Sequence, residues 1–342
     1  MKKYPPKYRE GDFIESIEGL IFDVKGLVHP PNKVVAFVRY IQDPEGDRER
    51  DGVRYRKVYS LVERGTFLRK HFPYYLIYDP VFGEELIEVP IKRVVRHYSP
   101  SYKLAELRSR SGLGLRTLEE KVLDLVNFLV DSTHVPRDKF GVSGSVMVGM
   151  MSASSDVDLI VYGLENAKKV DQALTNHFGE NKSLKKYSLE MLKTLYKSRC
   201  KENGVSFEDY VFHEQRKTFQ GFFHETEFFV RYVKDRDEFE ETYGKYVYAS
   251  MGQAKIKGVV TEDSDALFTP CSYGVANVNV IEGAFAGPIS TIVSFRGRFC
   301  QQVFKGERIV ASGKLEKVIH YGNTRYRLIL GNHPEDFMVA VK

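Results

Sequence analysis

The sequence predicts an α+β protein, in which a mixed sheet with helices occupies the middle of the chain and β-rich modules flank it. Helical spacing is clearest between Leu118 and Leu129, where apolar residues recur every three or four positions. Before and after this region, short β-branched and aromatic runs alternate with glycine and proline turns. We therefore expect a β-rich module over residues 1–110, a mixed core over 111–242 and a barrel-like β-rich module over 243–342.

In the first module we expect strands at Val34–Val38 and Val53–Val62 and a strand pair over Leu86–Val95, because these runs are rich in β-branched and aromatic residues. Asp43–Gly46 has the composition of a turn. The stretch Arg48–Lys57 carries basic residues that neighbouring acids nearly balance, and we interpret it as a solvated loop.

The core is expected to begin with a helix over Leu118–Asp131, with Thr117 as its N-cap and Glu120 as the capping-box partner. Further helices are expected at Glu165–Phe178 and Leu184–Asn203. The expected strands of the core are Phe140–Val142, Val157–Tyr162 and Phe219–Val233, with a turn or bulge at Gly221.

Helix signals largely vanish after Tyr243, and short β-runs separated by glycines predict a small barrel or sandwich. The last two runs are expected to form a hairpin through Tyr321–Asn323. The predicted strands are Ile256–Thr261, Val275–Ile281, Ile289–Phe295, Arg308–Val318 and Arg325–Leu330.

Composition excludes several classes of protein. With 342 residues, 42% hydrophobic and 28% charged, the chain has ordinary globular usage. Its longest apolar runs are far shorter than the roughly 20 residues of a membrane-spanning helix, and no apolar stretch follows the basic start, so we expect neither a membrane span nor a cleaved signal peptide. The three widely spaced cysteines indicate reduced thiols and a cytoplasmic protein.

The most informative pattern is a pair of carboxylates at the start of an apolar strand. Asp156 and Asp158 are two positions apart, so strand alternation puts both on one face, while Val157 and Leu159 point to the other. Such a pair repels itself unless a cation lies between the carboxylates. Mg²⁺ prefers carboxylate and phosphate oxygens, so the pair indicates a metal site. The alternative is a turn acid followed by a strand-edge acid.

A glycine–hydroxyl turn precedes this pair by ten residues. Gly144 lets the backbone approach a phosphate without a Cβ, and the Ser145 hydroxyl can donate to phosphate oxygens. The alternative role of Ser145 is to cap a helix.

Gly144-Ser145, the ten residues that follow and Asp156-Val157-Asp158-Leu159 resemble the signature of DNA polymerase β-type nucleotidyltransferases. Ser143 departs from that signature, which has an apolar residue there. The whole chain is also similar to uncharacterised archaeal proteins identified as nucleotidyltransferases, through Val24–Pro31 and Val38–Tyr40. The resemblance implies a nucleotidyltransferase-like central sheet, a nucleoside triphosphate (NTP) substrate and Mg²⁺ or Mn²⁺ at Asp156 and Asp158.

Members of this superfamily usually carry a third carboxylate on a later strand, and the resemblance implies Glu227 for this role, with Glu225 second. Both share parity with Arg231, a candidate for binding the nucleotide. The alternatives are solvated acids and a cross-strand ion pair for Arg231. Ser155, Arg216 and Lys217 are further nucleotide-binding candidates; for the last two, the alternative is an exposed basic pair.

The third module has a candidate surface for nucleic acid. Between Ser290 and Leu330 there are eight basic residues against two acids, and rings lie among them. The alternative is a solvated β-surface. The nucleic-acid-binding candidates are Arg296, Arg298, Phe299, Arg325 and Arg327.

These observations predict a metal-dependent nucleotidyltransferase that transfers a nucleoside monophosphate from an NTP to an acceptor hydroxyl. Nucleic acid is the first expectation for the acceptor, with RNA favoured over DNA; a protein or small-molecule acceptor stays open, as does the oligomeric state. The alternative is a nucleic-acid-binding protein with a catalytically inactive nucleotidyltransferase core.

Overall fold

The computed structural model describes residues 8–180, 183–200, 203–285 and 287–341. The chain forms two compact units, both of which contain helices and strands, so the coarse α+β class is confirmed. Unit 1 comprises Met1–Ile77, Glu85–Lys185 and Phe219–Tyr243, and unit 2 comprises Tyr78–Glu84, Lys186–Thr218 and Gly244–Lys342. The division into three modules stays a prediction.

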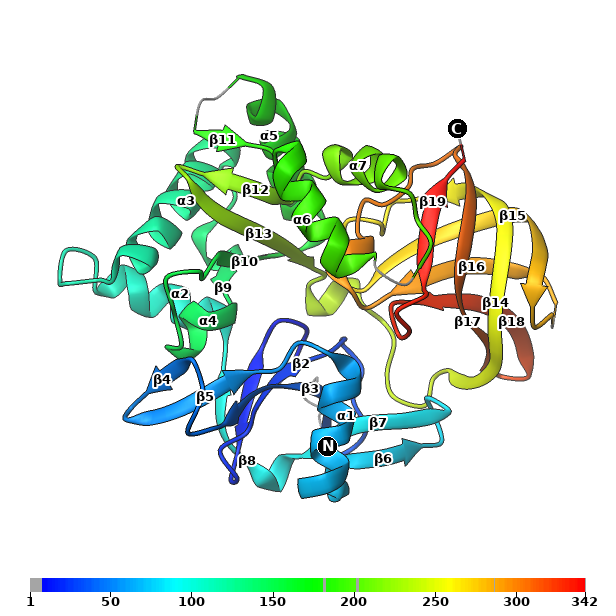
Figure 1. Cartoon of the computed structure of the whole chain (residues 1–342), viewed down its shortest axis with the longest axis horizontal. Coiled ribbons are helices and arrows are strands. Elements are labelled where there is room, and N and C mark those ends of the chain that lie inside the picture. Colours follow the sequence, from blue (N-terminus) through cyan, green and yellow to red (C-terminus); the bar gives the residue numbers. More distant parts are fainter. Residues whose placement is uncertain (1–7, 181–182, 201–202, 286, 342) are drawn as a thin grey trace. The chain divides into compact units, whose positions relative to one another are not determined.

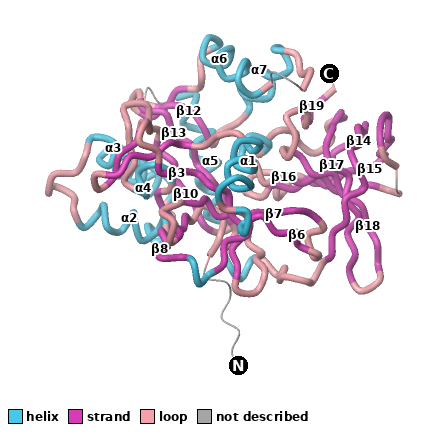
Figure 2. Tube along the Cα trace, turned by 60° about the horizontal axis from the view of Figure 1, so that its bottom comes forward, coloured by secondary structure: helices cyan, strands magenta, loops and turns pink. Residues whose placement is uncertain are grey.

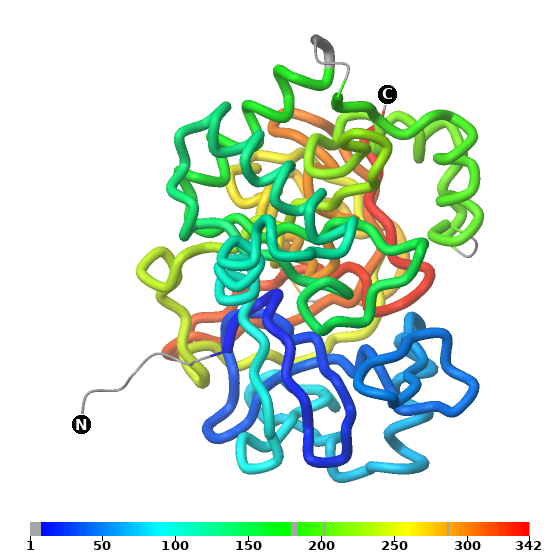
Figure 3. Tube along the Cα trace, turned by 90° about the vertical axis from the view of Figure 1, so that its left-hand side faces the viewer, coloured from blue at the N-terminus to red at the C-terminus, as the bar shows by residue number. Residues whose placement is uncertain are grey.

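Unit 1 opens with an antiparallel sheet in the order β4-β5-β3-β2-β1-β8, and β7 also pairs with β3 (Figure 1). Its blue to cyan strands lie together in Figure 3. The bounds are β1 Phe13–Ser16, β2 Ile21–Val24, β3 Lys33–Gln42, β4 Arg48–Arg50, β5 Val53–Lys57, β6 Leu76–Asp79, β7 Glu84–Pro90 and β8 Val94–Tyr98, with α1 Leu61–His71 and α2 Pro100–Ser109.

Two expectations for this region are wrong. The stretch Arg48–Lys57 is not a solvated loop, because it forms β4 and β5 and buries Arg48 and Tyr55. The strand expected to reach Val62 ends at Lys57, because the Ser60 hydroxyl accepts a hydrogen bond from the Glu63 N–H and starts α1.

The second sheet of unit 1 has the order β11-β12-β13-β10-β9, with β10 parallel to β13, and α3 and α5 pack on it. The strands expected at Phe140–Val142 and Val157–Tyr162 are present. The stretch Phe219–Val233 is a hairpin of two strands that turns at His224 and Glu225, both with positive φ, and not at Gly221. The bounds are α3 Thr117–Thr133, β9 Phe140–Val142, α4 Gly144–Val148, β10 Val157–Tyr162, α5 Leu164–Glu180, β11 Leu184–Lys185, β12 Gln220–Phe223 and β13 Thr226–Val233.

The N-terminus of α3 differs from the prediction by one residue. The Glu119 carboxylate, and not that of Glu120, accepts the N–H of the N-cap residue, Arg116, at 3.0 Å. With the capping residue at this position, Glu119 is buried and Glu120 is exposed.

The strand β10 separates two environments. Val157 and Leu159 are fully buried, whereas Asp158, Ile160 and Tyr162 share the opposite face by alternation. That opposite face meets the N-terminal segment, since Leu27 packs against Ile160 and Tyr162. The first sheet therefore lies on the same side of β10 as Asp158.

Unit 2 is built around a barrel. Because β14 pairs with both β15 and β17, the strands β14-β15-β16-β18-β17 close into a ring, with β19 beside β17, as the small barrel predicted from the sequence requires. Figure 2 shows these strands in magenta and two helices, α6 and α7, in cyan. The helix expected at Leu184–Asn203 is shorter, and α7 was not predicted. The bounds are α6 Leu189–Arg199, α7 Phe207–Arg216, β14 Val247–Glu262, β15 Cys271–Gly283, β16 Ile289–Ser294, β17 Arg308–His320, β18 Asn323–Leu330 and β19 Phe337–Ala340.

Candidate functional site

The two aspartates lie together in unit 1. Asp156 immediately precedes β10 and Asp158 is its second residue, and both are partly buried. Burial, and then the nearby charge of Asp156, raise the pKa of the Asp158 carboxyl to about 7. Two carboxylates that interact this strongly favour a proton or a cation between them.

The Gly-Ser turn packs directly against this pair. Gly144 begins α4 with φ +60°, and a Cβ at this position would lie 1.9 Å from Asp158 Oδ2, so only glycine fits without displacing the carboxylate. The Ser143 N–H donates to the Asp158 carbonyl at 2.8 Å, which fixes the turn to the strand.

Ser145 has an unusual side chain. It is 4% exposed, and its hydroxyl has no hydrogen-bond partner in the described structure. A buried hydroxyl without a partner costs roughly 1–3 kcal/mol. The predicted alternative, helix capping by the Ser145 hydroxyl, is not what this side chain does in the described structure.

Ser155 orders the loop that leads to Asp156. Its hydroxyl accepts from the Ser152 N–H at 2.9 Å and from the Arg48 guanidinium at 3.1 Å. The same guanidinium donates to the Ser152 hydroxyl and the Met150 carbonyl. Arg48 on β4 is thus a buried support for this loop, and Ser155 has a positioning role here.

Cations surround the carboxylates. Arg231, Lys57 and Arg39 each lower the pKa of Asp158, against the larger effect of burial and Asp156. Arg39 on β3 and Lys57 on β5 also lie over the ring of Tyr59, at 5.4 Å and 5.1 Å from its centroid. The first sheet therefore brings positive charge to the aspartates of the second.

A second layer of charge lies behind these cations. Arg231 on β13 forms an ion pair with the buried Glu10, so the predicted cross-strand ion pair is replaced by a partner from the N-terminal segment. Lys25 pairs with Glu10 at 3.2 Å and with Asp23 at 2.7 Å. Burial lowers the pKa of Lys25 although both carboxylates oppose it.

The third carboxylate is only partly placed by the structure. Phe228 pairs with Val157, so the parallel register puts Glu227 beside Asp156 on the face of Asp158. Glu225 lies in the hairpin turn, exposed and paired with Lys185, so it does not share that face. Among the described residues, no three His, Cys, Asp or Glu side chains are grouped so as to hold a metal ion.

A groove of about 670 Å³ lies beside the far end of α4 in unit 1. It is lined by Met147–Gly149, by Arg50 of β4 and by Tyr98 and Tyr102. Arg50 stands two residues from Arg48 on the same strand, so the groove adjoins the loop that carries Ser155.

Arg216 and Lys217 belong to unit 2, whereas Asp156 and Asp158 belong to unit 1. Arg216 lies on α7 of unit 2 and forms an ion pair with Glu307. Lys217 is 1% exposed, pairs with Glu214 and donates to the Arg298 carbonyl at 2.6 Å. The predicted alternative of an exposed basic pair is therefore wrong, because both cations have carboxylate partners in unit 2.

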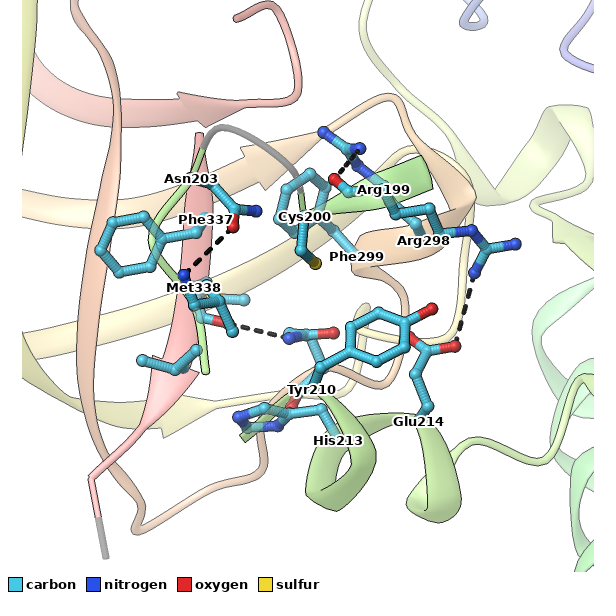
Figure 4. Close-up of a pocket in the computed structure, with 13 residues that line it drawn as sticks. Arg199, Cys200, Asn203, Tyr210, His213, Glu214, Arg298, Phe299, Phe337 and Met338 are labelled. Atoms are coloured by element: carbon cyan, nitrogen blue, oxygen red, sulfur yellow. Dashed lines mark hydrogen bonds and ion pairs between the residues drawn. The ribbon is translucent and has the colours of Figure 1, made fainter. Parts of the chain in front are cut away.

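A small pocket of about 40 Å³ in unit 2 collects several of these groups (Figure 4). Tyr210, His213 and Glu214 extend from α7, and Arg199 reaches Glu214 at 3.4 Å. Burial, and then Arg216, lower the pKa of His213 to about 4; this neutral ring contacts the Gln302 carbonyl and accepts the Ala340 N–H.

The predicted nucleic-acid residues do not form one surface. Phe299 is buried and Arg298 lines the small pocket, donating to the Arg199 carbonyl at 3.5 Å. Arg296 is partly buried, and its side chain packs over Gly331. Arg327 forms an ion pair with Glu316 at 2.9 Å. Of the five predicted residues, Arg325 is the exposed one.

Arg39, Lys57 and Arg48 are the residues that the sequence did not assign to the site. Arg39 lies within the Val38–Tyr40 segment that carries the resemblance, which was a usable signal. Lys57 is two residues after Tyr55 at the end of β5, so its side chain lies on the same face of the strand as the buried Tyr55. A basic residue on the inner face at a strand end was the second indication of a charged site.

The chain is 35% identical over 348 residues to an uncharacterised protein of Methanocaldococcus jannaschii, MJ1086, covering 98% of this chain and 99% of that protein. No protein family model matches the chain. No solved structure matches it either. Among the described residues, no helix combines the length and apolar character that a membrane crossing needs.

Proposed function

The chain belongs to the family of that archaeal protein, and we propose that it is a metal-dependent nucleotidyltransferase whose site lies in unit 1. The observation that carries the proposal is the contact of Gly144 with the Asp158 carboxylate, beside the partnerless hydroxyl of Ser145. A backbone without a Cβ, a free donor and two adjacent carboxylates are the groups that a metal-bound polyphosphate requires.

The residues of the chain divide the work between them. Ser145 donates to a phosphate oxygen, and Arg39, Lys57 and Arg231 balance the charge of the triphosphate. The oxygen of the acceptor hydroxyl bonds to the α-phosphorus and its proton passes to solvent water. The bond between the α-phosphorus and the α–β bridging oxygen breaks, and pyrophosphate leaves with that electron pair. Ser155, held by Arg48, keeps the loop before Asp156 in place.

Asp156 and Asp158 would hold Mg²⁺ or Mn²⁺, with Glu227 assisting. The donor set fits such an ion, because Mg²⁺ is commonly bound by one or two carboxylates and completed by substrate phosphates and water. The raised pKa of Asp158 supports the same assignment, since a cation in place of the proton removes the repulsion between the two carboxylates. When bound, the ion supplies charge neutralisation at the phosphates.

The groove beside α4 is the proposed site of the acceptor. It adjoins the loop of Ser155, and its lining combines the rings of Tyr98 and Tyr102 with charged side chains of both signs, among them Arg96, Lys103 and Glu106. A nucleic acid, and RNA before DNA, is the acceptor that we favour, because rings and basic side chains together suit bases and phosphates.

The test is transfer of label from each NTP. The protein is incubated with Mg²⁺ or Mn²⁺, with RNA, DNA or protein, and with NTPs labelled at either the α- or the γ-phosphate. We expect α-label and no γ-label on one acceptor, and a loss of about 10³-fold or more in the Asp156→Ala/Asp158→Ala variant. Asp124→Ala removes an exposed carboxylate of α3 in the same unit and serves as the control. Transfer that survives in the double variant would disprove the assignment.

A second candidate is a nucleic-acid-binding protein whose nucleotidyltransferase core no longer catalyses. One observation favours it, namely that Glu227 and the two aspartates are not grouped as a metal site among the described residues. This candidate predicts binding of oligonucleotides without transfer of either label.

A further inference from the structure

Three rings lie in a row in unit 2: His320 and Tyr321 at the tip of the hairpin of β17 and β18, and Tyr246 just before β14. The ring centroids of Tyr246 and His320 are 4.6 Å apart, and those of His320 and Tyr321 are 4.5 Å apart. Tyr321 is 89% exposed at the tip of the hairpin. The faces of this ring are therefore open to solvent, next to the ring of His320.

Basic side chains flank the same rings. The Arg325 guanidinium lies 5.0 Å from the centroid of Tyr246, and the Lys245 ammonium lies 5.8 Å from it. Arg325 is exposed, so its charge is available to an anion beside the rings. We call Tyr246, His320, Tyr321, Arg325 and Lys245 the ring platform.

The neighbouring arginine shows how the platform differs from the rest of the barrel. Arg327, two residues along β18, lies 4.0 Å from the centroid of Tyr248, but it is also paired with the buried Glu316. Phe82 stacks on Tyr248 as well, at 6.1 Å. That pair of arginine and ring is thus covered by its own unit, whereas the outer pair of Arg325 and Tyr246 leads to the exposed Tyr321.

We propose that the ring platform binds single-stranded nucleic acid, with bases stacked on Tyr321 and His320 and a phosphate beside Arg325. Stacking accepts any base, and a cation next to a ring meets the phosphate of the same nucleotide. Small barrels commonly use such loops for this purpose. The platform lies in unit 2, so the inference goes beyond the proposed site in unit 1, and it is tested by binding alone.

The chain contains no tryptophan, so Tyr321→Trp places a single fluorescent reporter on the platform while keeping a ring for stacking. Titration of the full chain with single-stranded oligouridylate, and separately with oligothymidylate, is expected to quench this fluorescence. RNA binding more tightly than DNA would indicate a contact with the 2′-hydroxyl. A duplex of equal charge is expected to compete poorly, because its bases are already stacked.

Two substitutions measure the contributions of ring and charge by anisotropy with labelled oligonucleotide. Tyr321→Ala is expected to weaken binding about tenfold. Arg325→Ala is expected to weaken binding and to reduce the slope of log affinity against log salt by about 0.7. Phe285→Ala removes another exposed ring, from the loop between β15 and β16, and is expected to bind like the wild type.

Three outcomes would overturn the platform: oligonucleotides that do not bind the full chain, binding without quenching of the tryptophan of Y321W, or a duplex that competes as well as the single strand. The first is also the outcome expected if the platform serves a protein partner. Failure of the transfer reaction is distinguishable, because the Asp156→Ala/Asp158→Ala variant is expected to keep its oligonucleotide affinity.

Discussion

In unit 1 burial, and then the charge of Asp156, raise the pKa of Asp158 to about 7, whereas in unit 2 two cations, Lys217 and Arg199, share the carboxylate of Glu214. Both sites are built from ordinary charged residues in partly or fully buried positions. In the unit 2 group both Lys217 and Arg199 contact a carboxylate of opposite charge, and His213 uses both ring nitrogens. The unit 1 group keeps two carboxylates side by side, and the pKa of Asp158 stays raised although Arg231, Lys57 and Arg39 lower it, so a further cation would stabilise the pair.

The difference separates charged residues that stabilise a unit from charged residues that need a ligand. A buried ion pair holds its own unit together, so removing one partner leaves an uncompensated charge. A pair of like charges opposes folding, so it persists where a ligand compensates it. Substitutions should therefore act in opposite directions on stability in the two sites.

The largest change in stability is expected for Glu214→Gln. The amide leaves Lys217, which is 1% exposed, without its counter-charge, and such a loss typically costs about 3–5 kcal/mol. Chemical denaturation measures the free energy of unfolding. Glu225→Gln, which breaks an exposed pair with Lys185, is the matched control and should unfold like the wild type. Equal stability of the two variants would show that the Glu214 carboxylate does not stabilise the buried Lys217.

Asp158→Asn is expected to change stability in the other direction. The pKa of Asp158 is raised to about 7 in the folded protein from 3.8, so the folded state binds more protons between these values. Stability is then full below about pH 4 and falls as pH rises to about 7. The amide removes this loss, which is on the order of 2 kcal/mol after screening by water.

Thermal unfolding at pH 5 and pH 8 without metal or nucleotide checks this expectation. The wild type should lose more stability between the two values than Asp158→Asn does, and Mg²⁺ with NTP should recover the loss in the wild type only. An identical pH dependence for both proteins would show that the two carboxylates do not interact as described.

Gly144→Ala should have an intermediate effect. The φ of +60° costs an alanine about 1–2 kcal/mol, and its Cβ would also push the Asp158 carboxylate aside, so transfer is expected to fall with stability. Gly112→Ala separates the two causes, because it has φ +77° and nothing within 4 Å of its Cβ. If Gly144→Ala were as active as Gly112→Ala, the close approach of Gly144 to the Asp158 carboxylate would not be needed for transfer.

Local patterns were enough to predict the part of the site that is local in sequence. Alternation put Val157 and Leu159 in the core and Asp158 on the other face, because strand periodicity depends on immediate neighbours. Local patterns also predicted the helix α3 and the hairpin that turns at Tyr321. Glu225 was assigned to the face of Glu227 because the two are an even number of residues apart. Strand alternation does not apply to Glu225, because it lies in the turn before β13.

The cations were not predictable in this way. Arg48 has acidic neighbours in sequence, and it is buried only because the loop of Ser152 and Ser155, more than a hundred residues away, accepts its guanidinium. Lys57 and Arg39, on strands of the first sheet, lower the pKa of Asp158 on the second by their charge. Local periodicity does not show which distant segments pack together. The basic residues of the site could therefore be identified only from the three-dimensional structure.

The smallest effect is expected for Ser145→Ala, and it tests the comparison at the level of a single hydroxyl. The Ser145 hydroxyl is buried without a partner, so its removal should stabilise the protein without nucleotide by about 1 kcal/mol. NTP affinity should fall up to about tenfold, because a donor to phosphate is lost. Ser206→Ala in unit 2 removes a hydroxyl that accepts the Asp209 N–H at 3.0 Å and should destabilise by about 1 kcal/mol. Two serine-to-alanine changes with opposite signs would show that unit 1 keeps an unmet polar group for a ligand, and a loss of stability in both would show that Ser145 is structural.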